Sequence, residues 1–278
     1  MKNKALIFLL TLLISCASLF QPLQNCEIPA HSPFPGGIIN VDFTYEEITK
    51  PNISVQGKVP FLCKVDSYQW KIIYPISLEE KNSKIQIKLD NKVIREIIIV
   101  PKNYRVSKIE IANLEMVTPP KKSLERIVNE SKILKETVKT VSQMTQSSLK
   151  MELPTLGIIS SEFGVKRFIN GKPRSPHSGT DIAAPTGTDV RAALNGKVML
   201  IGNFYYAGNV IYIDHGQGLL TSYSHLEKIK VTKGQKVLQN QIIGSVGKTG
   251  RVTGPHLHWQ TILLGTNIDP TLFLNSDT

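Results

Sequence analysis

Two histidines stand one residue apart in the stretch TGPHLHW, which covers residues 253–259. The run after Pro255 is rich in Trp, Ile and Thr, so it predicts a strand over 255–263. Side chains alternate between the two faces of a strand, so His256 and His258 share one face at a separation of about 6.5–7 Å. One imidazole can then hold a metal while the other handles protons. A pair of surface or cross-strand histidines has the same pattern, and the spacing alone leaves both interpretations open.

Histidines are concentrated in the C-terminal half of the chain. Five of the six occur there, namely His177, His215, His225, His256 and His258. Catalytic zinc takes three protein ligands from His and Asp or Glu and keeps a fourth position for water. The stretch PHSGTD offers His177 and Asp181 outside any helix, because Pro and Gly surround them. Residues four apart on a strand face the same side, so both can reach one ion if the chain bends locally.

These side chains must be positioned by the segment 151–278. Its glycines are frequent, and short apolar β segments such as GKVMLIG, NVIYIDHG and NQIIGSVG recur between closely spaced turn signals. This pattern predicts a compact antiparallel β domain. The preceding segment, 118–150, carries an apolar stripe at helical spacing, formed by Leu124, Ile127, Val128, Leu134, Val138 and Val141. The stripe predicts a connecting helix packed on one domain, and it spans too few heptads to favour a coiled coil.

Residues 27–117 predict a small domain that resembles a β-sandwich. The run KIQIKLDNKVIREIIIV alternates apolar and polar residues on both sides of an Asp90-Asn91 turn signal. Turn signals recur about every ten residues, as they do in sandwiches. The histidine of this region, His31, lies in a Pro-rich loop and is typical of a surface residue. The expected fold class is therefore mainly β, with a sandwich-like domain, a connecting helix and a C-terminal antiparallel domain.

The first residues, 1–16, have the pattern of a secretory signal. Lys2 and Lys4 precede an apolar run that ends in small residues, and this run is too short to span a membrane comfortably. Two cleavage sites compete. The run Leu-Ile-Ser-Cys resembles the lipobox of bacterial lipoproteins and would leave Cys16 as a lipid-anchored N-terminus, the alternative that we favour. An ordinary small-x-small site around Cys16 also fits. Either predicts an exported protein, in the periplasm or at the outer membrane or cell surface.

Cysteine number and charge bear on the compartment and the partners. If Cys16 carries lipid, Cys26 and Cys63 remain as an even pair for a disulfide outside the cytosol. The net charge of +11 favours an anionic partner such as nucleic acid, anionic lipid or a cell-wall polymer. Nucleic acid is not expected, because the sequence has no nucleic-acid-binding motif and its aromatic residues are not interleaved with the basic ones.

The order of motifs in the C-terminal segment resembles the lysostaphin/LytM-type zinc metallopeptidases, peptidase family M23. HSGTD, YSHL and GPHLH follow one another between about Ser160 and Pro270. The resemblance implies one Zn²⁺ per chain, with the ligands His177, Asp181 and His258. It also implies that His225 and His256 are catalytic histidines that do not bind the metal, and that His215 is structural.

The resemblance further implies a zinc-dependent endopeptidase that hydrolyses peptide cross-links of bacterial peptidoglycan, with a zinc-activated water as nucleophile and histidine as general acid and base. Peptidoglycan is then the expected partner, and the cut at a D-alanyl or a glycyl bond stays open. The alternative is a non-catalytic, wall-binding or hydrolase-activating LytM-type domain, which the full ligand set disfavours. A zinc protease of ordinary proteins would use the same chemistry. Asp189 and the loop NFYYAGN depart from the family pattern, and the loop leaves substrate preference open.

Overall fold

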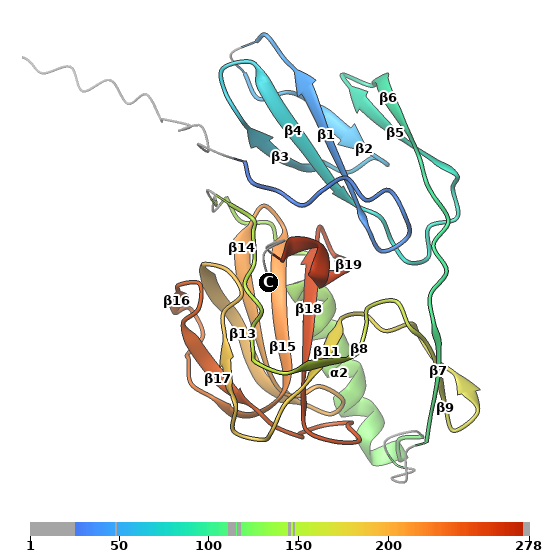
Figure 1. Cartoon of the computed structure of the whole chain (residues 1–278), viewed down its shortest axis with the longest axis vertical. Helices are drawn as coiled ribbons and strands as arrows, with labels where there is room; N and C mark the ends of the chain where they lie inside the picture. The colour runs from blue at the N-terminus through green and yellow to red at the C-terminus, as the bar shows by residue number, and fades with distance from the viewer. Residues whose placement is uncertain are drawn as a thin grey trace, which may run out of the picture.

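The computed structural model describes residues 26–47, 49–110, 115, 118–143, 146 and 148–274. The predicted signal over 1–16 and the lipid attachment at Cys16 lie outside these residues. The described chain is built mainly from antiparallel strands with the helix α2 (Figure 1), which confirms the mainly β fold class. Within the described residues, α2 and the other helical segments lack the length and hydropathy of a membrane span.

Two three-stranded antiparallel sheets form the N-terminal part. The first has the order β1-β4-β3, with β1 at Ile38–Thr44, β4 at Gln69–Pro75 and β3 at Phe61–Lys64. The second has the order β2-β5-β6, with β2 at Ile53–Val55, β5 at Lys84–Leu89 and β6 at Lys92–Ile98. Both sheets contribute to one buried cluster, which includes Trp70 and Ile72 from the first and Ile85 and Ile87 from the second. This shared core is the reason that the region forms the predicted sandwich-like arrangement.

The hairpin β5–β6 turns where the sequence predicts it. Asp90 has φ +48° and Asn91 has φ +64°. Two consecutive left-handed residues match the right-handed twist of hairpin strands, and Asp and Asn tolerate this conformation better than most residues. His31 is exposed as predicted, and its Nδ1 accepts the N–H of Asn40 at 3.1 Å.

The C-terminal part contains a ten-stranded sheet with the principal order β16-β13-β14-β15-β18-β11-β8, and β12, β17 and β19 join it off this path. Its strands are β8 (Ile158–Ser161), β11 (Thr180–Ala183), β12 (Asp189–Arg191), β13 (Gly196–Phe204), β14 (Gly208–Gly216), β15 (Leu219–Ile229), β16 (Lys236–Val237), β17 (Ile242–Val246), β18 (His256–Leu263) and β19 (Thr266–Ile268). The short helix η1 (Pro270–Phe273) follows. Trp259 of β18 and Tyr223 of β15 are fully buried between these elements, so the central strands rest on a rigid core.

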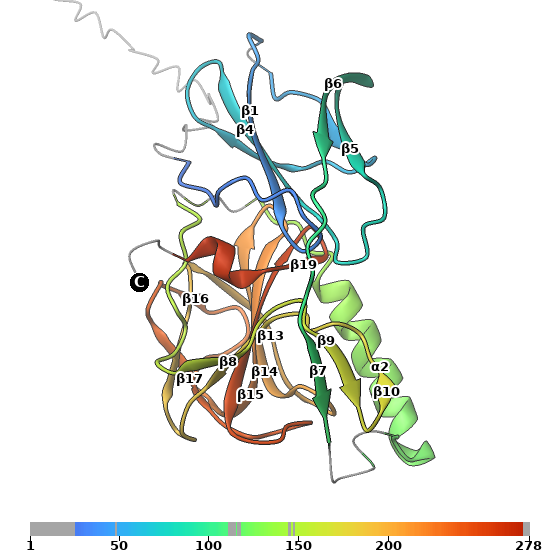
Figure 2. The ribbon, with the colours of Figure 1, turned by 45° about the vertical axis from the view of Figure 1, so that its right-hand side comes forward.

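One strand of the predicted N-terminal range 27–117 pairs with the C-terminal part. β7 (Val106–Ile109) lies parallel to β9 (Lys166–Ile169), which forms a hairpin with β10 (Lys172–Pro173). Figure 2 shows β7 running down beside β9, away from the sandwich. The open edge of the β9–β10 hairpin offers unpaired backbone groups, and β7 satisfies them. The chain thus crosses onto the C-terminal part before the helix begins.

Helix α2 (Lys121–Thr137) is shorter than the predicted helical segment 118–150. After it, the backbone finds partners outside a helix: Ser142 accepts the N–H of Gln217, and the N–H of Leu149 bonds to Glu27. Leu134 and Val138 pack against the cluster on the outer face of β13 and β14. The helix therefore rests on the C-terminal part as predicted, but Leu124 and Val128 of the stripe stay exposed.

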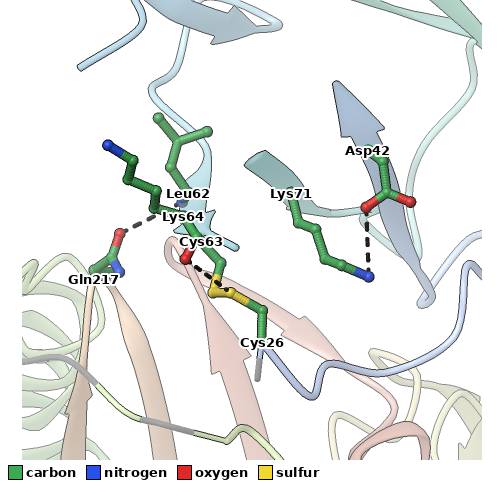
Figure 3. The surroundings of a disulfide bond; sticks show 7 residues. All are labelled: Cys26, Asp42, Leu62, Cys63, Lys64, Lys71 and Gln217. Carbon is green, nitrogen blue, oxygen red and sulfur yellow. Dashed lines mark hydrogen bonds and ion pairs between the residues drawn. A yellow bond between two sulfur atoms is a disulfide. The ribbon is translucent and has the colours of Figure 1, made fainter. Parts of the chain in front are cut away.

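The predicted disulfide between Cys26 and Cys63 is present, with a Cα–Cα distance of 6.3 Å. Figure 3 shows it beside Gln217 of the β14–β15 turn, whose side chain accepts the N–H of Leu62 at 3.4 Å. Cys63 belongs to the cluster of buried residues that joins the sandwich to the C-terminal part. The bond therefore fixes the start of the described chain at the junction of the two parts.

Removing this disulfide is expected to destabilise the protein. The bond joins residues 37 positions apart, and the loop-entropy treatment gives about 3–4 kcal/mol for such a closure. Urea unfolding of the Cys26→Ala/Cys63→Ala variant should show this loss, whereas a reducing agent should lower the stability of the unmodified protein alone. Equal unfolding free energies with and without the bond would contradict the prediction, as would free thiols at both positions in non-reducing peptide mapping.

His215 has the structural role that the sequence predicts. Its Nδ1 lies 2.7 Å from the carbonyl oxygen of Asn195 and its Nε2 lies 2.8 Å from the hydroxyl of Thr221. A carbonyl oxygen only accepts, so the neutral ring carries its proton on Nδ1. The hydroxyl of Thr221 in turn lies 3.0 Å from that of Tyr223. This fully buried chain of polar groups is saturated while His215 is neutral.

Acid is therefore expected to destabilise the fold through His215. Burial lowers the pKa of His215 to about 4, whereas an unfolded histidine titrates near pH 6.5. Below about pH 6.5 the unfolded chain binds the extra proton, so the stabilisation is complete above that pH and is lost on acidification at up to about 1.4 kcal/mol per pH unit. Unfolding of zinc-loaded His215→Asn should show a smaller slope between pH 6.5 and 4. Identical slopes in the two proteins would reject this account.

Candidate metal centre and active site

Strand register brings the first two candidate ligands together. β18 lies between β11 and β15 in the sheet. Asp181 of β11 is directly opposite His258 of β18, and His258 is opposite Ser224 of β15 on its other side. His256 shares the face of His258, because it stands two residues before it on the same strand. The predicted strand over 255–263 thus supplies both histidines to one pocket.

His177 reaches the same place from the loop before β11. Its side chain is fully buried, and its backbone N–H donates to Val165. Gly179 allows the loop to approach β18 closely: a Cβ at this position would collide with the carbonyl oxygen of Trp259 and approach Cε1 of His258. Only a residue without a side chain lets the loop lie this close to β18. The spacing His-x-Gly-x-Asp therefore has a steric cause.

Three ligand atoms converge in this pocket. Oδ1 of Asp181 lies 2.9 Å from Nε2 of His177 and 2.7 Å from Nδ1 of His258, and the two nitrogens lie 3.1 Å apart. Ligands that are about 2.0–2.1 Å from a tetrahedral zinc lie roughly 3.3 Å from one another. The three atoms are close to that spacing, and each of the three residues offers one ligand atom within 4.8 Å of the others. Two imidazoles and one carboxylate are also the donor set of catalytic zinc sites.

Backbone carbonyl groups hold three of the histidine rings. Nδ1 of His177 lies 2.8 Å from the carbonyl oxygen of Glu162, that of His225 lies 2.9 Å from Thr249, and that of His256 lies 2.9 Å from Gly254. Each Nδ1 therefore carries the proton of the neutral ring, and each Nε2 keeps a free lone pair. Such outer contacts fix the tautomer and orientation of a metal-binding or catalytic imidazole.

His225 and His256 form a second pair beside the three ligand candidates. Their ring centroids are 4.8 Å apart, and that of His225 is 6.0 Å from the ring of His258. Nε2 of His256 lies 3.9 Å from Oδ1 of Asp181, farther than the ligand atoms lie from one another. The structure thus brings all five predicted site residues together, in two groups.

The backbone at His225 has a conformation that the position of this residue in the sequence does not predict. It has φ +65°, a conformation that few residues other than glycine adopt. The strand β15 continues past it to Ile229. The N–H of His225 donates to Ala207 at 2.8 Å. This local twist turns the ring into the pocket, at a position where a regular strand would have a different side-chain direction.

The protonation states of the pocket suit metal binding. Burial lowers the pKa of His177 to about 4 and that of His225 to about 3. Burial would raise the pKa of Asp181, but the close contacts with the rings of His177 and His258 outweigh it and hold the pKa well below its usual range. Neutral imidazoles and an ionised carboxylate are the forms that coordinate zinc.

Arg167 is a neighbour of the site that the sequence reasoning did not single out. Its Nη2 lies 3.4 Å from Oδ2 of Asp181, the oxygen that faces away from His258 and His177. It lies in β9, and a lone arginine on a short strand has no spacing signal of its own. Its contact with Asp181 depends on the tertiary fold, because β9 and β11 belong to different sheets.

Comparison with known proteins identifies the family. Residues 175–270 match the family model of peptidase family M23. The crystal structure of a putative peptidase M23 from Pseudomonas aeruginosa aligns with a TM-score of 0.70 at 30% identity, over 91% of this chain and 96% of that one. The chain belongs to peptidase family M23. As an M23 chain with this His-Asp-His set, it has the site for one Zn²⁺.

Two curated M23-type relatives match the C-terminal part. Peptidoglycan DD-endopeptidase ShyA of Vibrio cholerae is 48% identical over 112 residues, which are 40% of this chain and 26% of that protein. DD-carboxypeptidase/endopeptidase Mpg of Neisseria meningitidis is 39% identical over 112 residues, with the same two shares. The match to this chain spans about a quarter of the length of both relatives.

Proposed function

We propose that this M23 chain is a zinc-dependent endopeptidase that hydrolyses peptide cross-links of bacterial peptidoglycan. The observation that carries the proposal is the convergence of Asp181 and four histidines in one pocket, with ligand atoms at zinc spacing. The activities in the names of ShyA and Mpg support the substrate class. The positive charge of the chain suits an anionic wall or membrane.

In this proposal His177, Asp181 and His258 hold the metal. Zinc in such a site lowers the pKa of a bound water to about 7 and polarises a substrate carbonyl. The carbonyl of Glu162 holds the ring of His177 in the tautomer whose Nε2 lone pair faces the pocket. Arg167 faces the second oxygen of Asp181 at 3.4 Å, which leaves Oδ1 as the oxygen for the metal.

His225 and His256 handle the protons. Their Nδ1 atoms are held by backbone carbonyls, so Nε2 is the atom that takes a proton from the attacking water and returns it to the leaving amine. One ring acts as base, and the other, when protonated, stabilises the oxyanion that develops on the carbonyl oxygen. The pair lies within 4.8 Å, centroid to centroid, so both reach the same reacting group.

The location belongs to the same proposal. We propose export through a signal over 1–16, with lipid attached to Cys16 and the β sandwich, 27–117, tethered close to the membrane. More than one acyl chain is needed for stable anchoring, because a single chain binds membranes only marginally. The divisions 27–117, 118–150 and 151–278 remain our proposal for the domains, with the parallel β7–β9 pairing as a link between the first and the last.

Digestion of purified peptidoglycan tests the function. The mature protein is incubated with sacculi in the presence of zinc and, separately, of a chelator, and the released muropeptides are analysed by mass. We expect cross-linked dimers to be converted to monomers only with zinc, and the masses to show whether a D-alanyl or a glycyl bond is cut. Sacculi that remain cross-linked with the zinc-loaded protein would contradict the proposal, and cleavage of casein at a comparable rate would favour a general protease.

A further inference from the structure

Three arginines lie in the two segments next to the metal centre. Arg167 lies in β9, Arg174 follows β10 in the same hairpin, and Arg251 belongs to the loop between β17 and β18. The backbone N–H of Arg174 donates to the carbonyl of Arg167 at 2.9 Å. Arg167 reaches Asp181, as described above. Arg167 and Arg174 thus belong to one hairpin, and Arg251 comes from a separate loop.

Arg251 is held in place by an aromatic face. Its guanidinium carbon lies 4.4 Å from the ring centroid of Tyr206, and its backbone N–H donates to the carbonyl of Tyr206 at 2.9 Å. A guanidinium stacked on an aromatic ring keeps its N–H groups in its own plane, where they can bind a planar anion. Tyr206 lies in the loop NFYYAGN, whose sequence departs from the family pattern. A residue of this departing loop, Tyr206, thus contacts Arg251 directly.

The loop that carries Arg251 also supports the catalytic histidines. Thr249 accepts the Nδ1 proton of His225, and Gly254 accepts that of His256. Arg251 stands between these two residues in the chain. The loop of Arg251 is therefore the same one that orients both catalytic histidines.

Arg167 retains a donor that the described residues do not satisfy. Its Nε is buried and has no hydrogen-bond partner within that part of the chain. The ion pair with Asp181 uses Nη2 of Arg167 and does not reach Nε. A buried donor without a partner costs free energy, and such groups in native proteins often mark a ligand site.

The positive charges of Arg174 and Arg251 act on one another. Burial and the charge of Arg174 lower the pKa of Arg251. Like charges kept this close in a partly buried place repel one another unless an anion joins them. Arginine is the side chain best suited to bind a carboxylate through two parallel hydrogen bonds.

We propose that Arg251, with Arg167 beside it, forms a subsite next to the metal centre that binds a carboxylate of the substrate peptide. The inference rests on the proposed peptidase function and deepens it, because it assigns recognition of a negative charge to these residues. The carboxylate has two sources in a cross-linked peptide: the free α-carboxylate at a peptide end and a side-chain carboxylate within the peptide. Both share the planar, anionic chemistry that the arginines recognise.

Kinetics with amidated substrates test the subsite. The zinc-loaded full chain is assayed on a cross-linked peptide dimer in three forms: native, with the terminal α-carboxylate amidated, and with the side-chain carboxylates amidated. We expect one amidated form to raise KM about tenfold or more, the scale of a lost charge-assisted hydrogen bond, and that form identifies the source. Arg251→Gln should raise KM for the native dimer by a similar factor and should no longer distinguish the three forms, whereas Arg251→Lys should fall between.

Arg191→Gln is the matched control, because Arg191 is an exposed arginine in β12 that bonds to the carbonyl of Asn240. It should behave as the unmodified protein does. Equal KM values for all three substrates with the unmodified protein would overturn the proposal, as would an Arg251→Gln variant that keeps the full discrimination. The first comparison needs no variant, so it decides the matter even if Arg251→Gln fails to fold.

Binding of the monomeric peptide that cleavage of the dimer would release separates this proposal from the proposed function. Its affinity for the zinc-loaded chain is measured by calorimetry, in carboxylate and amidated form and at increasing salt. We expect amidation to weaken binding about tenfold or more, as it would remove a charge-assisted contact, and salt to weaken the carboxylate form alone. A protein that cleaves no peptidoglycan but discriminates the two forms would refute the peptidase and keep the subsite. Cleavage without discrimination would do the opposite.

Discussion

The His258→Ala variant is expected to lose most of its zinc and its peptidase activity. Nδ1 of His258 lies 2.7 Å from Oδ1 of Asp181 and 3.1 Å from Nε2 of His177, so its loss removes one of three converging protein donors. Loss of an outer-shell partner already weakens metal binding by about 10–100-fold, and loss of a ligand itself should weaken it more. Elemental analysis after dialysis against a weak chelator, normalised per chain, gives the zinc content.

The exposed His31 provides the control for this measurement. It lies in the sandwich, where its Nδ1 accepts a backbone N–H, so His31→Ala should keep one zinc per chain. Full zinc occupancy in a His177→Ala/His258→Ala double variant would refute the ligand assignment. Asp181→Asn should lose zinc as well, because a neutral amide replaces the carboxylate that lies between the two rings.

The His256→Ala variant is expected to keep zinc and lose turnover by about 10²-fold or more, the scale of acid–base catalysis. Its Nε2 lies 3.9 Å from Oδ1 of Asp181, outside the closely spaced set of ligand atoms. Its Nδ1 is held by the carbonyl of Gly254, so the ring is oriented for proton transfer. Turnover of a cross-linked peptide and zinc per chain are measured on the same sample.

His225→Ala should likewise keep zinc and lose turnover, because His225 faces His256 at 4.8 Å between ring centroids. A variant of either histidine that is inactive and also lacks zinc would make that residue a ligand. His225→Gly provides a further comparison: glycine adopts the backbone φ of +65° without strain, so its activity reports the loss of the ring alone. Activity that survives in His225→Gly would exclude His225 from the proton transfer.

Local sequence pattern predicts much of the scaffold. The β5–β6 hairpin follows from alternating apolar residues around Asp90-Asn91, and the strand of His256 and His258 follows from the Gly-Pro start and its β-rich run. The helix is predicted less well. The apolar periodicity extends to Val141, but the helix ends at Thr137. Beyond it, the backbone forms hydrogen bonds with that of Gln217 and Glu27 instead of continuing the helix. Such long-range competition leaves no local pattern.

Through a family resemblance, the order and spacing of HSGTD, YSHL and GPHLH predict five site residues. The M23 membership that the resemblance implies is confirmed. The tertiary structure alone decided how they meet. Asp181 faces His258 because β11 and β18 pair in one register, and a shift by one residue would turn Asp181 to the other face. His225 enters the pocket through a left-handed backbone, and Arg167 of β9 and Arg251 of the β17–β18 loop, about eighty residues apart in the chain, belong to the segments around it. Register, loop closure and burial are non-local quantities, so residue types and spacing do not determine them.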